Sequence, residues 1–368
     1  LAIVLAMTLI CAVVSYAGIW AAYGFRYSIT PNPDVRMNLP IIVRAAVRSQ
    51  LMVAHPEIDD PSGEAIAEGM KHPPRIARVV VWLNDRQLLP EAWLSGFLDT
   101  YATTIRRWAF LSGDRRDTGW WYYFPLAWLF KSPLATITAV GISIVLALRT
   151  RLVKRIRHLD RWTTCCLAIP IIIYAASAMS SNLNLGVRHI LPIVPLIFVR
   201  VGVTVAHARA IAPRFTTASI AILGAGLLVE SISAAPDYIA YFNVAAGGSR
   251  GGIRLLGDSN LDWGQDLILL RKWQQAHPEI DLILDYFGSS DANYYVKFTP
   301  LIVNNAVPNP GALGRDRSGR QVLAISATKL QGIYPPVAPH PFYAYMRERA
   351  PSEVLGGTVY LYELPLQD

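Results

Sequence analysis

Long apolar runs alternate with polar and basic stretches along this chain. A run of about 20 apolar residues is long enough for a helix to cross the roughly 30 Å hydrocarbon core of a bilayer. Such runs predict about five membrane spans, at residues 1–23, 124–148, 162–181, 190–206 and 216–235. The composition agrees, because 53% of the residues are hydrophobic and 16% are charged, against about 25% charged in an average soluble domain.

Residues 24–118, between the first two predicted spans, are too polar for a bilayer and predict a long loop with helices of its own. Apolar residues at helical spacing predict one helix at 38–54 and an aromatic-rich one at 90–112. The second helix either lies flat on the membrane surface, with its aromatic rings at headgroup depth, or packs on its own loop domain.

The chain after the last span predicts a small α/β region at residues 236–368. A helix is expected at 266–275, and β-rich runs predict strands at 282–287, 321–326 and 358–364. The predicted fold is a multi-pass α-helical membrane protein of about five spans, with a helical loop and a C-terminal α/β region. Its two parts are residues 1–235 and 236–368.

The net charge of +8 gathers beside the predicted spans. Residues 149–161 hold six Lys or Arg, and such clusters face the cytoplasm in membrane proteins. This orientation makes the 24–118 loop and the 236–368 region extracytoplasmic. Because the charge sets orientation, we expect no nucleic-acid partner.

The beginning of the chain and its cysteines narrow the class further. The chain starts at Leu1 with an uncharged run, which favours a piece of a longer membrane protein over a signal peptide. Cys11, Cys165 and Cys166 lie in apolar runs, and their spacing predicts neither a metal site nor a disulfide framework. No phosphate loop, dinucleotide fingerprint or nucleophile elbow occurs in the sequence.

Charges inside apolar runs are candidate site residues. Lys131 follows the aromatic cluster at 119–125, where Tyr123 is a candidate substrate contact. The Lys131 ammonium either reaches the headgroups or meets an anionic ligand. Arg200 and Glu230 lie near the ends of predicted spans, from which they can reach the headgroups.

Arg188 and His189 lie where the fourth predicted span begins. A helix N-terminus with a forked arginine donor can bind a phosphate group. The alternative is an arginine that is solvated among the headgroups.

The stretch from Asp258 to Asp266 is dense in polar groups and also contains Trp263. Asp258, Asp262 and Asp266 are spaced so that a helix would place them on one face, where like charges repel. They either contact substrate or a metal, or serve as turn and capping residues, with Asp262 or Gly264 as the N-cap of the following helix.

Five sequence blocks occur here in the order found in a known family. They are Leu89–Gly96, Gly119–Pro125 with Lys131–Pro133, Leu185–Pro192, Tyr238–Gly248 and Asp258–Leu267. Together they resemble the C-terminal half of bacterial family 39 glycosyltransferases, which are GT-C membrane enzymes related to protein O-mannosyltransferases and lipid A aminoarabinose transferases. The resemblance covers nearly the whole chain.

The resemblance implies a transferase of the bacterial inner membrane. It moves a sugar from a polyprenyl-phosphate carrier to a protein, lipid or glycan acceptor on the extracytoplasmic side, usually with inversion. Arg188 and His189 would bind the lipid phosphate, with Lys131 a weaker candidate, and a divalent metal is a possible cofactor. The family's catalytic carboxylate lies upstream of this chain, so we expect the chain alone to be inactive.

Two other classes of function stay open. A transporter or flippase for a lipid-linked glycan needs polar residues along several spans, yet two of the predicted spans, 1–23 and 162–181, carry no charge. A non-catalytic membrane anchor would present the 236–368 region as a binding module.

Overall fold

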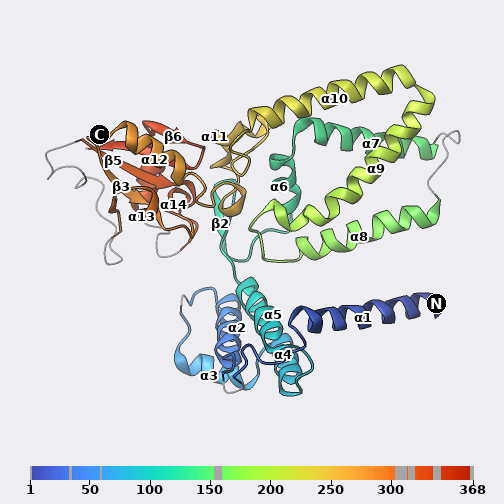
Figure 1. The fold of residues 1–368 in the computed structure, drawn as a ribbon, viewed down its shortest axis with the longest axis horizontal. Helices are drawn as coiled ribbons and strands as arrows, with labels where there is room; N and C mark the ends of the chain where they lie inside the picture. Colours follow the sequence, from blue (N-terminus) through green and yellow to red (C-terminus); the bar gives the residue numbers. More distant parts are fainter. Residues whose placement is uncertain are drawn as a thin grey trace. The chain divides into compact units, whose positions relative to one another are not determined.

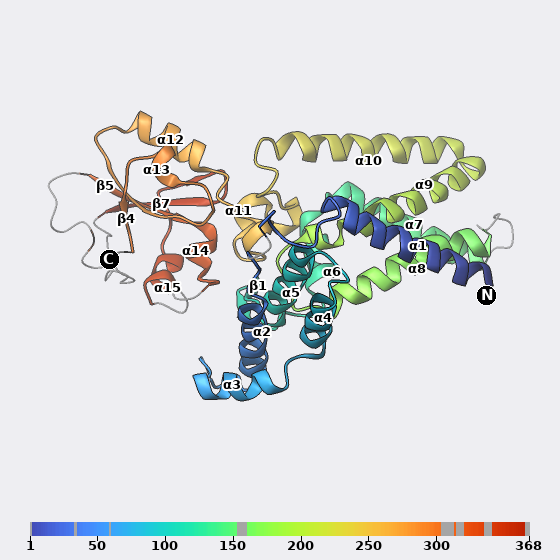
Figure 2. The same ribbon diagram turned by 60° about the horizontal axis from the view of Figure 1, so that its bottom comes forward.

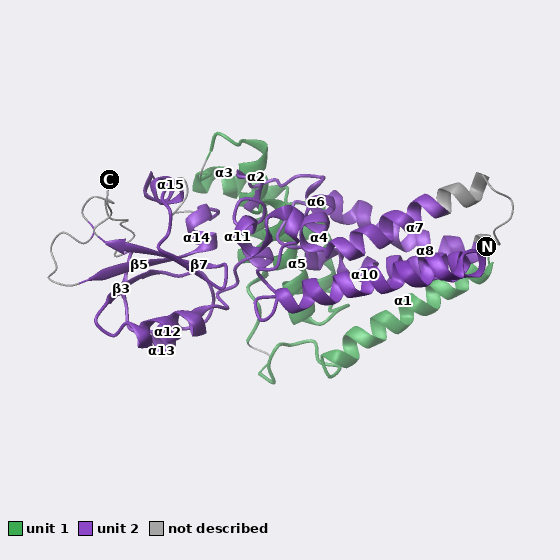
Figure 3. Ribbon diagram, turned by 90° about the horizontal axis from the view of Figure 1, so that it is seen from above, with its two compact units in different colours: residues 1–107 green, residues 108–368 purple. Residues whose placement is uncertain are grey.

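A computed structural model describes residues 2–32, 35–58, 60–152, 160–302, 313, 320–334 and 341–364. The chain divides into two compact units, Leu1–Arg107 and Trp108–Asp368 (Figure 3). The helices after residue 108 and the α/β region therefore belong to one unit, whereas the sequence pattern divides the chain at residue 235. Part of the basic run at 149–161 lies outside the described residues.

Four of the described helices are long and apolar enough to cross a membrane, or up to five if one bent pair forms a single span. The four candidate spans are Ala2–Ala22, Trp162–Met179, Val187–Ile211 and Pro213–Ser233. They correspond to predicted spans one, three, four and five. In the structure they comprise α1 (Ala2–Ala22), α8 (Arg161–Met179), the 3₁₀ helix η1 (Val187–Ile193) with α9 (Val194–Ile211), and α10 (Pro213–Ser233).

The second predicted span, 124–148, is broken in the structure. It forms α6 (Tyr123–Lys131) and α7 (Leu134–Leu152), which are bent by 120° (Figure 1). Pro133 disfavours a helical conformation at Ser132. The Asn243 side-chain amide donates to the carbonyls of Leu129, at 2.6 Å, and Ser132, at 2.9 Å. The bend is thus held by a residue that lies more than a hundred positions later in the chain.

Glu230 has a defined role at the same break. Its carboxylate accepts a hydrogen bond from the Leu134 backbone N–H at 2.9 Å, at the first residue of α7. It also accepts one from the Tyr241 hydroxyl at 3.2 Å. Glu230 thus caps α7, because a carboxylate at a helix N-terminus satisfies an amide group that has no partner within the helix. That it reaches the headgroups stays a prediction.

The first unit joins α1 to a small helical domain. Its other helices are α2 (Leu39–Ala54), α3 (Gly63–Lys71), α4 (Arg75–Asp85) and α5 (Glu91–Ile105). Their shared core is made of Leu39, Val43, Val47, Ile66, Ala77, Val80, Leu94 and Leu98. Tyr16 and Trp20 of α1 both donate to the Leu88 carbonyl, at 2.7 and 3.3 Å, which ties the span to the turn before α5.

The helix predicted at 90–112 is shorter and packs within this domain. In α5, Leu94, Leu98 and Ala102 are buried, while Phe97 stays half-exposed and stacks on Trp93. The chain then leaves the helix and forms the hairpin of β1 (Ala109–Leu111) and β2 (Asp114–Arg116). The predicted extension to residue 112 was wrong, because three successive buried apolar residues suit a strand as well as a helix.

The α/β region holds a mixed sheet of five strands. Its strands are β3 (Asp281–Asp285), β4 (Thr299–Pro300), β5 (Gln321–Ser326), β6 (Glu353–Leu355) and β7 (Val359–Leu364). The strand order is β4-β3-β5-β7-β6, with β3 parallel to β4 and β5, and β7 antiparallel to β5 and β6. The three strands predicted from the sequence are confirmed as β3, β5 and β7.

Helices cover both faces of this sheet (Figure 2). The helices α12 (Leu267–Ala276) and α13 (Ala292–Tyr295) lie on one face, and α14 (Ala327–Gln331) and α15 (Pro341–Glu348) lie on the other. The side chains of β5 point alternately to the two faces of the sheet. Val322 and Ala324 pack in the core beneath α12 and α13, while Leu323 and Ile325 pack in the core beneath α14 and α15.

Short helical turns connect α10 to the α/β region. They are the 3₁₀ helix η2 (Val244–Ala246), α11 (Gly248–Gly252) and the 3₁₀ helix η3 (Asp258–Asn260). The stretch from η3 to Asp266, which we call the carboxylate turn, runs directly into α12. The carboxylate turn connects the candidate site, described below, to the helices on both faces of the sheet.

Candidate functional site

Asn260 is the residue around which the candidate site is built. It is 1% exposed, and its side-chain amide donates to the Tyr123 hydroxyl, at 2.7 Å, and to the Leu185 carbonyl, at 3.3 Å. Its side-chain oxygen accepts from the Val187 N–H at 2.9 Å. One buried side chain thus joins α6, the start of η1 and the carboxylate turn.

Lys131 completes this joint from the end of α6. Its ammonium donates to the carbonyls of Ile239, at 2.7 Å, and Asn260, at 2.6 Å, and lies 4.6 Å from the centre of the Phe242 ring. The two carbonyls occupy two of the three N–H donors of the ammonium, and the Phe242 ring lies against it. We therefore assign Lys131 to the frame of the site, and its predicted contact with an anionic ligand stays a prediction.

Arg188 lies in the first turn of η1 with its side chain exposed. Its guanidinium carbon is 5.5 Å from the centre of the Trp263 ring, a cation–π contact. Within the described residues the guanidinium forms no hydrogen bond or ion pair, so its forked donors are available to a ligand. The Val187 N–H, in contrast, is used by Asn260. The arginine side chain is therefore the main anion-binding group available at this helix start.

His189 faces a cavity on the other side of the same turn. The cavity has a volume of about 210 Å³ and is lined by Phe124, Tyr174, Ser177, Ala178, Ser181, Leu183 and His189. The Nε2 atom of His189 is buried and has no hydrogen-bond partner among the described residues. A buried polar atom without a partner is costly, so a polar ligand group or water is expected beside it.

The carboxylates of the carboxylate turn bind other segments of the chain. Asp258, in a left-handed conformation with φ of 53°, accepts a short hydrogen bond from the Tyr334 hydroxyl. Asp262 accepts from the backbone N–H groups of Gly264, at 3.0 Å, and Thr328, at 3.1 Å. The first two carboxylates thus hold the turn to the segment around α14, which favours turn duty among the predicted alternatives.

Asp266 ties the start of α12 to the turn between β6 and β7. It accepts from the Thr358 hydroxyl at 2.6 Å, and a Cβ atom on Gly356 would lie 2.1 Å from its Oδ2 atom. Asp266 also occupies the N-cap position of α12, without a side-chain capping bond. The prediction of Asp262 or Gly264 as the N-cap was wrong, because the chain does not become helical until Leu267.

Burial changes the protonation of this turn. It raises the pKa of Asp262 to about 6, although the N–H groups of Thr328 and Gly264 act in the opposite direction. It also raises the pKa of Asp266, against the hydrogen bond from Thr358. Both carboxyl groups therefore hold a proton at a pH where they would be ionised in the unfolded chain.

This gives a pH dependence of stability to which Asp262 contributes. The folded chain binds more protons than the unfolded chain between pH 3.8 and about 6, so stability falls as the pH rises through this window. From pH 5 to pH 7 we expect Asp262 to lower the free energy of unfolding by about 1–2 kcal/mol. The thermal midpoint of the purified protein at both pH values measures this. The variant Asp262→Asn should show a smaller difference between the two, and an undiminished difference would contradict the assignment.

The residues predicted as site residues separate into two groups. Tyr123, Lys131, Arg188, His189 and Trp263 gather around the start of η1. Asp258, Asp262 and Asp266 hold the carboxylate turn to the α/β region. Among the residues that the structure describes, no three His, Cys, Asp or Glu side chains form a group that could hold a metal ion.

Sequence reasoning missed Asn260, the residue that holds the first group together. Asn260 lies within the block Asp258–Leu267, but its amide is one polar group among many there. Its partners lie more than seventy residues earlier in the chain, so spacing gives no signal for them.

Comparison with known proteins adds no identification. The chain matches no protein-family model, no curated protein and no solved structure. The resemblance to family 39 glycosyltransferases therefore stays an expectation that rests on the five sequence blocks.

Proposed function

We propose that this chain belongs to a membrane glycosyltransferase that moves a sugar from a polyprenyl-phosphate donor to an acceptor. The site lies at one end of the candidate spans of the second unit, where the phosphate of a lipid-linked donor would contact water. We also propose that this end is extracytoplasmic in the bacterial inner membrane, since the basic run at 149–161 favours the cytoplasm for the opposite end.

The proposal rests on the exposed and unneutralised guanidinium of Arg188. This guanidinium lies at the entry of a candidate span, and no described residue neutralises its charge. Arginine binds phosphate through two parallel N–H···O bonds. The buried Nε2 atom of His189, in the next position, offers a second polar group beside a cavity.

The chemistry assigns Arg188 to the leaving group. In an inverting transfer the acceptor oxygen forms a bond to the anomeric carbon while the bond from that carbon to the phosphate oxygen breaks. The bonding electrons leave with the phosphate, and Arg188 stabilises the added negative charge. The acceptor proton passes to a carboxylate base, which the resemblance places upstream of Leu1. Tyr123 and Lys131 lie at the two ends of α6 and hold this helix in place beside η1.

The test follows a labelled sugar from donor to acceptor. Protein expressed from its complete gene is placed in vesicles with a radiolabelled polyprenyl-phosphate sugar and a membrane extract as the source of acceptors. We expect label in lipid, protein or glycan at a rate well above that of empty vesicles. Label that crosses the bilayer but stays on the carrier would contradict the proposal and favour a transporter.

A further inference from the structure

Trp263 is an exposed aromatic residue on a rigid turn. Its side chain is 46% exposed. The Trp263 backbone N–H donates to the Gln265 side-chain oxygen at 2.8 Å, and the Gln265 side-chain amide donates to the Leu261 carbonyl at 3.1 Å. An indole left in water forgoes a large apolar burial. The turn holds the exposed part of the ring where a ligand can contact it.

A second segment, Tyr286–Ser289, is locked against this turn. The Tyr286 hydroxyl donates to the Gly264 carbonyl at 3.2 Å. Gly264 has φ of 75°, and a Cβ atom there would lie 2.1 Å from the Tyr286 hydroxyl oxygen. Glycine is therefore required at this position, and the close approach sets the spacing between the two segments.

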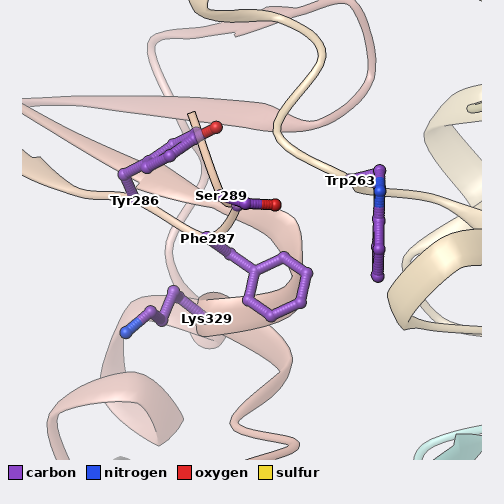
Figure 4. Close-up of a pocket in the computed structure, with 6 residues that line it drawn as sticks. Trp263, Tyr286, Phe287, Ser289 and Lys329 are labelled. Atoms are coloured by element: carbon purple, nitrogen blue, oxygen red, sulfur yellow. The ribbon is translucent and has the colours of Figure 1, made fainter. Parts of the chain in front are cut away.

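The two segments enclose a cleft of about 360 Å³, which we call the tryptophan cleft (Figure 4). It is lined by Trp263, Tyr286, Phe287, Gly288, Ser289 and Lys329. The rings of Trp263 and Phe287 meet at 69° with their centres 6.2 Å apart, and Phe287 stacks on Tyr334 behind it. The stacking on Tyr334 thus holds the Phe287 ring in place as a wall of the cleft.

The polar groups of the cleft suit a neutral ligand better than an anion. The Lys329 ammonium lies 3.4 Å from the buried carboxylate of Asp285, which balances its charge. Ser289 adds a hydroxyl group that both donates and accepts. A ring with an apolar face and hydroxyl groups at its rim matches aromatic walls with few polar groups between them.

We propose that the tryptophan cleft binds the pyranose ring of a sugar, with an apolar face of the ring against Trp263. The choice of a sugar rests on the proposed transferase function, and the contact between Trp263 and Arg188 places the cleft beside the proposed phosphate site. The sugar comes either from the donor lipid or from the acceptor glycan, which share this chemistry.

The test measures sugar binding without transfer. Full-length protein in lipid nanodiscs is mixed with the methyl glycosides of mannose, glucose and galactose, and saturation-transfer NMR records the contact of each sugar with the protein. We expect transfer to ring protons of at least one glycoside, binding about tenfold weaker in Trp263→Leu, and near-normal binding in Trp263→Phe. The matched control is Trp82→Leu, since Trp82 is also exposed with an arginine over its ring.

A competition experiment then shows whether the bound sugar belongs to the donor lipid or to the acceptor glycan. Excess polyprenyl-phosphate mannose displaces the glycoside if the cleft holds the donor sugar, and leaves it bound if the cleft holds the acceptor. Equal binding in Trp263→Leu and the wild type, or no binding of any glycoside, would overturn the inference. Sugar binding that depends on Trp263 in a protein that transfers no label would uphold it and refute the proposed function instead.

Discussion

Replacing Arg188 by alanine is expected to lower sugar transfer at least about a hundredfold, the usual effect of removing a donor that stabilises developing negative charge. The loss is large because Lys131, the other candidate cation, already donates to two backbone carbonyls. The measurement is the initial rate of label transfer in vesicles that contain equal amounts of folded protein.

Two further variants make this prediction specific. Arg188→Lys keeps the charge but loses the fork, so we expect an intermediate rate. Arg271→Ala removes an exposed arginine from α12, outside the residues assigned to the site, and should transfer at the normal rate. A rate for Arg188→Ala within threefold of the wild type would remove Arg188 from the site.

Replacing Asn260 by alanine is expected to cause the largest loss of stability. The change deprives the Tyr123 hydroxyl and the Val187 N–H of their Asn260 partner, while the Leu185 carbonyl keeps its hydrogen bond from the Ser259 hydroxyl. Buried polar groups left without a partner cost about 1–3 kcal/mol each, which corresponds to a fall of about 10 °C in the thermal midpoint. The midpoint is measured on detergent-purified protein.

A second variant at this position tests whether side-chain volume alone is enough. Asn260→Asp keeps the volume but buries a negative charge beside the Leu185 carbonyl, so its midpoint should also fall. Asn293→Ala, at an exposed position of α13, should leave the midpoint unchanged. A normal midpoint in both Asn260 variants would show that this residue does not hold the site together.

The candidate spans and the sheet strands could be predicted because each depends on local pattern. Length and apolarity alone define α1, α8 and α10, which bury few of their side chains within the chain. β-rich runs bounded by turn residues define β5 and β7. These features need no information about distant partners.

The break between α6 and α7 could not be predicted in the same way. Proline and serine at 132–133 are compatible with a kinked span. The bend of 120° depends on Asn243 and Glu230, which bind the two helix ends from about a hundred residues away. A charge within an apolar run is thus ambiguous until its partner is known.

The candidate site was predictable by residue type but not by arrangement. Arg188 and Trp263 stand out as a cation and an indole beside apolar runs, and the structure brings them into contact. Lys131 stands out equally, yet it binds backbone carbonyls. A sequence shows which side chains can bind an anion, but not which of them are already occupied.

Binding of a polyprenyl phosphate that carries no sugar tests the central claim most directly. Its dissociation constant is measured for full-length protein in nanodiscs of uncharged lipid, with the wild type, Arg188→Ala and Arg271→Ala compared at one salt concentration. Phosphate recognition by Arg188 predicts that only Arg188→Ala binds at least about tenfold more weakly. Equal affinity in all three proteins would contradict it.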